Sequence, residues 1–175
     1  TVNLDNTNSG ALFANAGIRA FTNGTGNINL TTGATVNTLG ARAEAVSALT
    51  VQGVIAINNS GKLTTTGSPS HGIQATTGGN IGIINTGDIS TSGASADGII
   101  ATTTAGTVNV ENSAAITSDL SIGVQLLAGG AASGAISNSA AGAISGTTGV
   151  QTGANFSAVE ISNSGTITGT SANGV

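Results

Sequence analysis

Residues 83–99 read IINTGDISTSGASADGI, and residues 159–175 repeat the same pattern as VEISNSGTITGTSANGV. In both stretches an apolar residue stands two positions before an Asn, and an Ile follows four positions after it. Both end in a Gly followed by a branched apolar residue. Neither contains Cys or His, so repetition is their informative property.

The small–apolar pair that closes both stretches recurs along the whole chain at intervals of 25–28 residues. The seven copies are Gly17-Ile18, Ala45-Val46, Gly72-Ile73, Gly98-Ile99, Gly123-Val124, Gly149-Val150 and Gly174-Val175. A second motif, apolar-x-apolar-x-Asn, recurs with the same spacing. A regular internal repeat of this length indicates a solenoid.

The apolar residues within each repeat alternate with polar ones, which predicts short strands with one buried face. No stretch of about 10–15 residues reads as a helix that would connect ordinary βαβ units. The leucine-rich pattern of another solenoid class is also absent. We therefore predict an all-β fold: a right-handed parallel β-helix with about seven rungs of about 26 residues. Residues 1–175 should form a single β-helix segment, expected to be a fragment of a longer repeat array.

The composition excludes several classes of function. Only 6% of the residues are charged, the net charge is −4, and the basic residues are Arg19, Arg42 and Lys62. Nucleic-acid binding needs clustered Lys and Arg, and a transmembrane helix needs about 18 consecutive apolar residues, so we expect neither. The carboxylates are scattered over different repeat positions, so no catalytic residues and no cofactor are expected. We interpret the chain as a non-enzyme.

The Asn of the second motif should form one column, because equivalent residues of a β-helix stack about 4.8 Å apart. Its members are Asn6, Asn59, Asn85, Asn112, Asn138 and Asn163, with Thr32 in the remaining place. The column could be a polar binding strip. We interpret it instead as a structural Asn ladder, in which stacked amides bond to one another and to the backbone of the turns.

Two outward positions per repeat carry short hydroxyl side chains, which predicts an exposed hydroxyl face. Its members are Thr64, Thr66, Ser90, Ser92, Thr117, Ser145, Thr147, Thr168 and Thr170. Such Thr-x-Thr arrays resemble those of ice-binding proteins, although Asp119 interrupts this one. The simpler interpretation is that Ser and Thr suit exposed strand positions.

The residue before the small–apolar pair is charged or titratable in three successive repeats: Glu44, His71 and Asp97. Stacked one rung apart, the two carboxylates should raise the pKa of the histidine between them. The three side chains could also hold a divalent cation weakly or take part in acid–base chemistry. We interpret them as a surface charge ladder and assign no metal site.

The stretches INNSGKLTTTG (57–67), IINTGDISTSG (83–93) and ISNSGTITGT (161–170) resemble the repeats of bacterial autotransporter passenger domains, the type V secreted surface proteins. Adhesins of the filamentous-haemagglutinin type have similar repeats. The resemblance covers nearly the whole chain. It implies a right-handed β-helix, export through the outer membrane, and a role in adhesion, aggregation or biofilm formation. It carries over no catalytic residue, because no protease motif is present.

The leading hypothesis from the sequence is therefore a secreted or cell-surface β-helical adhesin, or the stalk of one. Its localisation would be extracellular, and its partners would be host-cell, matrix or self surfaces. The alternative is an extracellular filament or matrix subunit that self-associates end to end. An ice-binding protein is the minor alternative.

Overall fold

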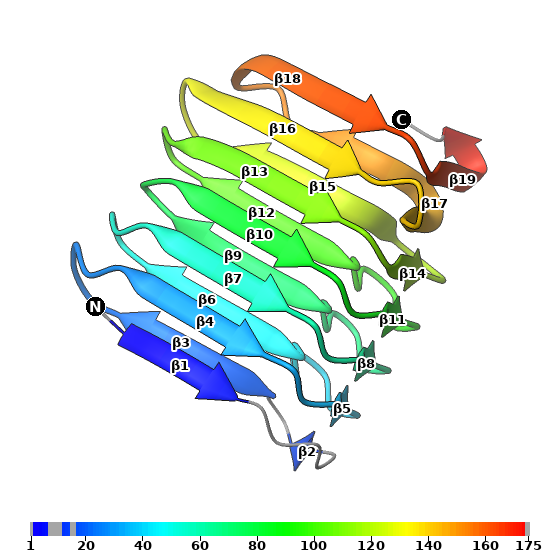
Figure 1. Ribbon diagram of the computed structural model, residues 1–175, viewed down its shortest axis with the longest axis horizontal. Helices are drawn as coiled ribbons and strands as arrows, with labels where there is room; N and C mark the ends of the chain where they lie inside the picture. Colours follow the sequence, from blue (N-terminus) through cyan, green and yellow to red (C-terminus); the bar gives the residue numbers. More distant parts are fainter. Residues whose placement is uncertain (1, 7–11, 15–16, 174–175) are drawn as a thin grey trace.

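The chain winds into a right-handed parallel β-helix without any α-helix in the part that is described (Figure 1). The computed structural model describes residues 2–6, 12–14 and 17–173, with side chains described from residue 17 to residue 171. The anchor pair at 174–175 therefore lies outside the described residues. Every strand pairs parallel to the equivalent strand one turn away, so the predicted fold class is confirmed.

Each turn contributes a strand to three columns, called here the first, second and third columns. The first column forms a seven-stranded sheet of β1 (Val2–Asn6), β4 (Ile28–Thr32), β7 (Ile55–Asn59), β10 (Ile81–Asn85), β13 (Thr107–Asn112), β16 (Ala132–Asn138) and β18 (Phe156–Asn163). The second column contains β2 (Leu12–Ala14), β5 (Val36–Thr38), β8 (Leu63–Thr65), β11 (Ile89–Thr91) and β14 (Ala115–Ser118). The third column contains β3 (Ile18–Thr22), β6 (Val46–Thr50), β9 (Ile73–Thr77), β12 (Ile99–Thr103) and β15 (Ile122–Ala128). Near the C-terminus, β17 (Ala143–Thr152) and β19 (Thr166–Asn173) continue the second and third columns.

The described part of the chain makes about six turns, so the prediction of about seven rungs is slightly too high. The seven copies of the anchor pair enclose only six intervals, which accounts for the difference. The predicted period of about 26 residues is confirmed by the register: Ile55 pairs with Ile81, 26 positions later.

The core is a narrow stack of branched aliphatic side chains that point inward from all three columns. In the first column, Ile28, Ile55, Ile81 and Val108 follow one another in register and are at most 2% exposed. Burial of such a side chain contributes on the order of 1.5–3 kcal/mol. In the last turn the apolar side chains are only partly buried, as at Ile161 and Ile167.

The corner between the second and third columns shortens near the C-terminus, whereas the earlier drift in repeat length arises at the corner between the third and first columns, which covers residues 23–27, 51–54 and 78–80 in successive turns. The connection between the second and third columns covers residues 39–45, 66–72 and 92–98 in three successive turns, but only 119–121 in the next. In the following turn the connection disappears, because β17 pairs with β14 through Ala143–Ser145 and with β15 from Thr148 onward. One bent strand thus joins the two columns.

The small residue of the anchor pair is required by close contact between turns. A Cβ atom added at Gly98 would lie 2.3 Å from Cγ2 of Ile116 and 2.6 Å from the carbonyl oxygen of Gly123. A larger side chain here would displace both the core and the next turn. The recurring Gly in the sequence therefore marks where the third column begins.

Candidate functional site

The Asn column lies at the end of the first-column strands, where the chain turns the corner. Asn59, Asn85, Asn112, Asn138 and Asn163 pair in succession in the strand register. The register also places Thr32 and Asn6 in this column, although the side chain of Asn6 lies outside the described part. The four central Asn residues of this stack, from Asn59 to Asn138, are at most 2% exposed.

Each amide from Asn59 to Asn138 donates to the next one along the rod. The Nδ2 atoms of Asn59, Asn85, Asn112 and Asn138 lie 2.8, 2.8, 2.9 and 2.8 Å from the Oδ1 of the following Asn. The same amides satisfy the turn backbone: Nδ2 of Asn112 donates to the carbonyl of Ala114 at 2.7 Å. The column therefore serves as internal scaffolding, and its side chains from Thr32 to Asn138 are buried, with an exposed end at Asn163.

Two further polar columns inside the solenoid were missed in the sequence. Thr38, Thr65 and Thr91 end the second-column strands, are fully buried, and donate to the carbonyls of Ala43, Ser70 and Ala96. Thr50, Thr77 and Thr103 end the third-column strands and donate to the carbonyls of Gly26, Gly53 and Gly79 at 2.9, 2.6 and 2.7 Å. The recurring pairs Leu-x-Thr, Ile-x-Thr and Ala-x-Thr at these places were the available signal. Every corner of the regular turns is thus held by a buried amide or hydroxyl.

The predicted hydroxyl face is continuous in only one of its two lines. Thr64, Ser90, Thr117, Ser145 and Thr168 pair in register and point outward. They are half-buried or exposed, and the Oγ of Ser145 lies 3.4 Å from Oγ1 of Thr117.

The second line is broken where the corner shortens. Thr66 and Ser92 follow their strands and are exposed, and Asp119 takes the next place, donating its backbone N–H to Thr91. The backbone N–H of Thr147 instead donates to Ser121 at 2.7 Å. Thr147 therefore does not continue the line of Thr66 and Ser92. Thr170 lies at the same irregular corner, where its Oγ1 donates to Gly146 at 3.2 Å.

Glu44, His71 and Asp97 occupy successive turns, as their spacing predicted. The backbone N–H groups of Ala45 and Gly72 donate to the carbonyls of His71 and Asp97 at 3.1 and 3.0 Å. The Nδ1 of His71 accepts the backbone N–H of Asp97 at 3.0 Å and lies 3.6 Å from that residue's carboxylate oxygen Oδ2. The carboxylate also accepts hydrogen bonds from the Ser121 hydroxyl at 2.5 Å and the Ile122 N–H at 3.1 Å.

The expected rise in the pKa of His71 is wrong. Burial lowers the pKa of His71 below its ordinary value, and the opposing charges of Asp97 and Glu44 do not overcome this effect. The imidazole side chain is only 12% exposed, so desolvation of its charged form is costly. The hydrogen bond from the backbone N–H of Asp97 also requires an unprotonated Nδ1. The stack therefore favours a neutral histidine.

The three side chains do not converge on one point. No group of three or more His, Cys, Asp or Glu side chains able to hold a metal ion occurs among the described residues. His71 and Asp97 do border a shallow hollow of about 410 Å³, which is also lined by Pro69, Ser95 and Gln125. The pair is held in place by backbone and hydroxyl hydrogen bonds, which is what a structural role requires.

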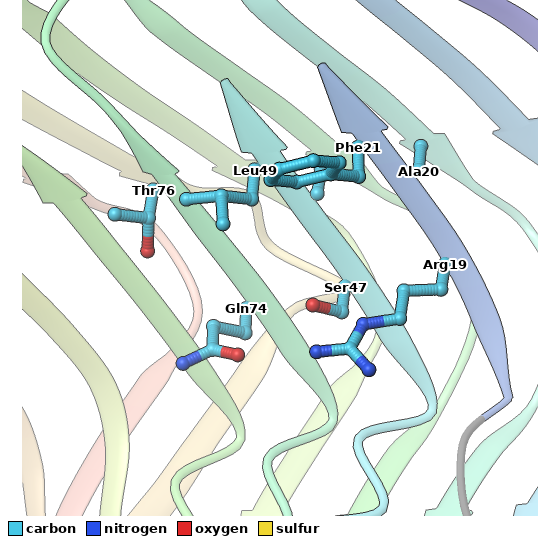
Figure 2. Close-up of a pocket in the computed structure, with 8 residues that line it drawn as sticks. Arg19, Ala20, Phe21, Ser47, Leu49, Gln74 and Thr76 are labelled. Atoms are coloured by element: carbon cyan, nitrogen blue, oxygen red, sulfur yellow. The ribbon is translucent and has the colours of Figure 1, made fainter. Parts of the chain in front are cut away.

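A groove of about 410 Å³ lies on the outer face of the third column, over β3, β6 and β9 (Figure 2). Its side chains form two rows in register: Arg19, Ser47 and Gln74 in one row, and Phe21, Leu49 and Thr76 in the other. Figure 2 shows the Phe21 ring beside Leu49, and the Arg19 guanidinium extended toward Ser47 and Gln74.

The groove combines exposed apolar and charged groups that are rare in this chain. Phe21 is 53% exposed and Leu49 is 40% exposed. The whole chain contains three Phe and three basic residues. The available signal in the sequence is the alternation around Ile18 and Ala20, which puts Arg19 and Phe21 on one outward face.

Comparisons with models of known protein families, with curated proteins and with solved structures find no match. No segment within the described ranges forms a helix long and apolar enough to cross a membrane. The fold and its surface are therefore the grounds for a functional proposal.

Proposed function

We propose that the chain is a β-helical passenger segment of a bacterial surface protein, of the autotransporter type, and that it acts as an adhesin. The proposal places it outside the cell, with host-cell, matrix or self surfaces as partners. The observation that carries it is the contrast, within the described residues, between an interior whose buried polar side chains are all hydrogen-bonded and a lateral surface of mostly short polar side chains with a groove over β3, β6 and β9. The same rod would hold that surface away from the cell as a stalk.

The physics of the rod suits this role. Each turn pairs only with its neighbours, so turns can be added one after another onto a template after export. No cysteine is present, so folding needs no oxidation step. Among the side chains described, no buried polar atom lacks a hydrogen-bond partner, so the interior supports a stiff rod.

The adhesive role is tested with microspheres that carry the purified chain through a terminal tag. We expect coated beads to be retained on epithelial cells or extracellular matrix, or to aggregate with one another, more than albumin-coated beads. Heat-unfolded chain on the same beads is the matched control, because a folded lateral surface is required. Retention and aggregation at the albumin level in every arm would overturn the adhesive role.

A specific observation also favours the second candidate, end-to-end association into a filament. Within the described strands, β18 is the last member of its sheet and pairs only with β16. Exposed strand edges are templates for pairing with another chain. Sedimentation velocity of the chain decides this candidate: species that grow with concentration in the micromolar range support it, and a constant monomer contradicts it.

A further inference from the structure

We propose that the groove over β3, β6 and β9 binds a carboxylated saccharide of one or two sugar rings, such as a uronic acid unit. Arg19 would bind the carboxylate, Ser47 and Gln74 would bind ring hydroxyls, and Phe21 with Leu49 would contact the apolar C–H face of the ring. The inference deepens the proposed adhesive function by naming the ligand class, and it rests on that function for its biological meaning only.

The charge argument concerns Arg19. Its exposed guanidinium forms no ion pair among the side chains from residue 17 to residue 171. Its row continues with the uncharged Ser47 and Gln74. A guanidinium binds a carboxylate through two parallel hydrogen bonds, which gives orientation as well as attraction. The groove therefore offers one cationic position at one end of a polar row.

The second row supplies an apolar surface directly beside the first. Phe21 and Leu49 are adjacent in register and both exposed. Sites for small ligands combine apolar contact with a few placed polar groups and measure about 300–1,000 Å³. The groove, at about 410 Å³, falls in this range and suits one or two pyranose rings.

The strand pairing leaves side chains as the recognition groups over most of the groove. Extended peptides are commonly recognised by main-chain hydrogen bonds to a free sheet edge. β6 pairs with β3 and β9, and β9 pairs with β6 and β12, so both edges of these two strands are occupied, whereas β3 pairs only with β6 among the described strands. Over β6 and β9 a ligand would meet side chains, namely Leu49, the half-buried amide of Gln74 and the largely buried hydroxyl of Ser47. The guanidinium of Arg19 and the ring of Phe21 come from β3.

The test is an NMR titration of the isotopically labelled chain with sodium glucuronate, with glucose as the neutral probe and N-acetyl-dialanine as the peptide carboxylate. We expect saturable amide shifts confined to residues 19–21, 47–49 and 74–76, with millimolar affinity for glucuronate. Glucose should bind roughly tenfold more weakly, the equivalent of one lost charged contact.

Variants locate the contacts. Arg19→Gln should weaken glucuronate binding roughly tenfold. Phe21→Ser should weaken the binding of both glucuronate and glucose. Lys62→Gln, which removes an exposed cation elsewhere, should leave binding unchanged. Because Arg19 and Phe21 are exposed, the variants should keep the wild-type spectrum outside the groove.

The proposal is overturned by absence of saturable shifts, by equal affinity for glucose, by tighter binding of N-acetyl-dialanine, or by wild-type affinity of Arg19→Gln. These outcomes are separable from the adhesion test. Beads that adhere while glucuronate fails to bind would retain the adhesive role and remove this ligand. Glucuronate binding without bead adhesion would keep this ligand and remove the adhesive role.

Discussion

The Asn ladder and the Glu44–His71–Asp97 stack are built in the same way, with one side chain per turn, but they differ in how far they extend. Five consecutive Asn residues hydrogen-bond in one direction through at least four turns. The titratable stack covers three turns and then gives way to Ile122. The fold therefore contains one column of identical stacked side chains and one column of different stacked side chains.

The difference follows from hydrogen-bonding chemistry. A carboxamide is donor and acceptor at once, so identical copies satisfy one another without limit. A carboxylate only accepts, and a neutral imidazole has one donor and one acceptor. The carboxylate of Asp97 therefore depends on the Ser121 hydroxyl and the Ile122 backbone N–H, while Nδ1 of His71 accepts the backbone N–H of Asp97, and these are different groups at fixed places. Only the amide column can be repeated indefinitely.

The largest effect is expected when the amide column is given a carboxylate. Asn112→Asp would place a carboxylate oxygen against the carbonyl of Ala114 and Oδ1 of Asn138, where Nδ2 now donates. We expect the free energy of unfolding at neutral pH to fall by about 3–5 kcal/mol, the cost of an unpaired buried charge. Urea denaturation followed by circular dichroism measures it.

The matched control is Asn109→Asp in the same strand, because Asn109 is exposed. Asn109→Asp should change the free energy of unfolding by no more than about 0.5 kcal/mol. Equal losses at the two positions would mean that the amide bonds contribute nothing specific, and the comparison between the columns would fail.

A smaller effect is expected at a corner that is held by a hydroxyl. Thr65→Val keeps the shape of the side chain but removes the donor to the carbonyl of Ser70. We expect a loss of about 1 kcal/mol in the free energy of unfolding. Thr64→Val, on the outward side of the same strand, should change it by less than about 0.5 kcal/mol. A larger loss at Thr64 would contradict the structural role of the inner Thr column.

The smallest expected effect is the pH dependence contributed by His71. Because its pKa is lowered in the folded state, the unfolded chain binds a proton first as the pH falls. The contribution of His71 to stability is therefore complete above about pH 6.5 and decreases as the pH falls from there toward the folded pKa.

Urea denaturation of the wild type and His71→Gln at several pH values between 7.5 and 5.5 isolates this contribution. The stability difference between the two proteins should shift in favour of the variant as the pH decreases. A shift in the opposite direction would mean that the charges of Asp97 and Glu44 affect the pKa of His71 more than burial does.

Much of the fold could be predicted from local pattern alone, because a solenoid repeats its contacts with its sequence. The spacing of Gly72-Ile73 and Gly98-Ile99 predicted the turn length, and the alternation around Ile81 and Ile83 predicted the inward face; both are confirmed. The Asn positions also followed from that register. The inner Thr columns were missed because Thr reads as a surface residue when its neighbours in space are unknown.

The sequence by itself determined the repeat length, the three short strands per turn and the stacking of equivalent residues, because these depend on periodicity. Only the tertiary structure decided the sign of the His71 pKa shift, the break in the hydroxyl face at Thr147, and the groove between Arg19, Phe21 and Gln74. Those features depend on burial, corner length and side-chain direction, which arise from contacts between turns and have no counterpart in the order of residues.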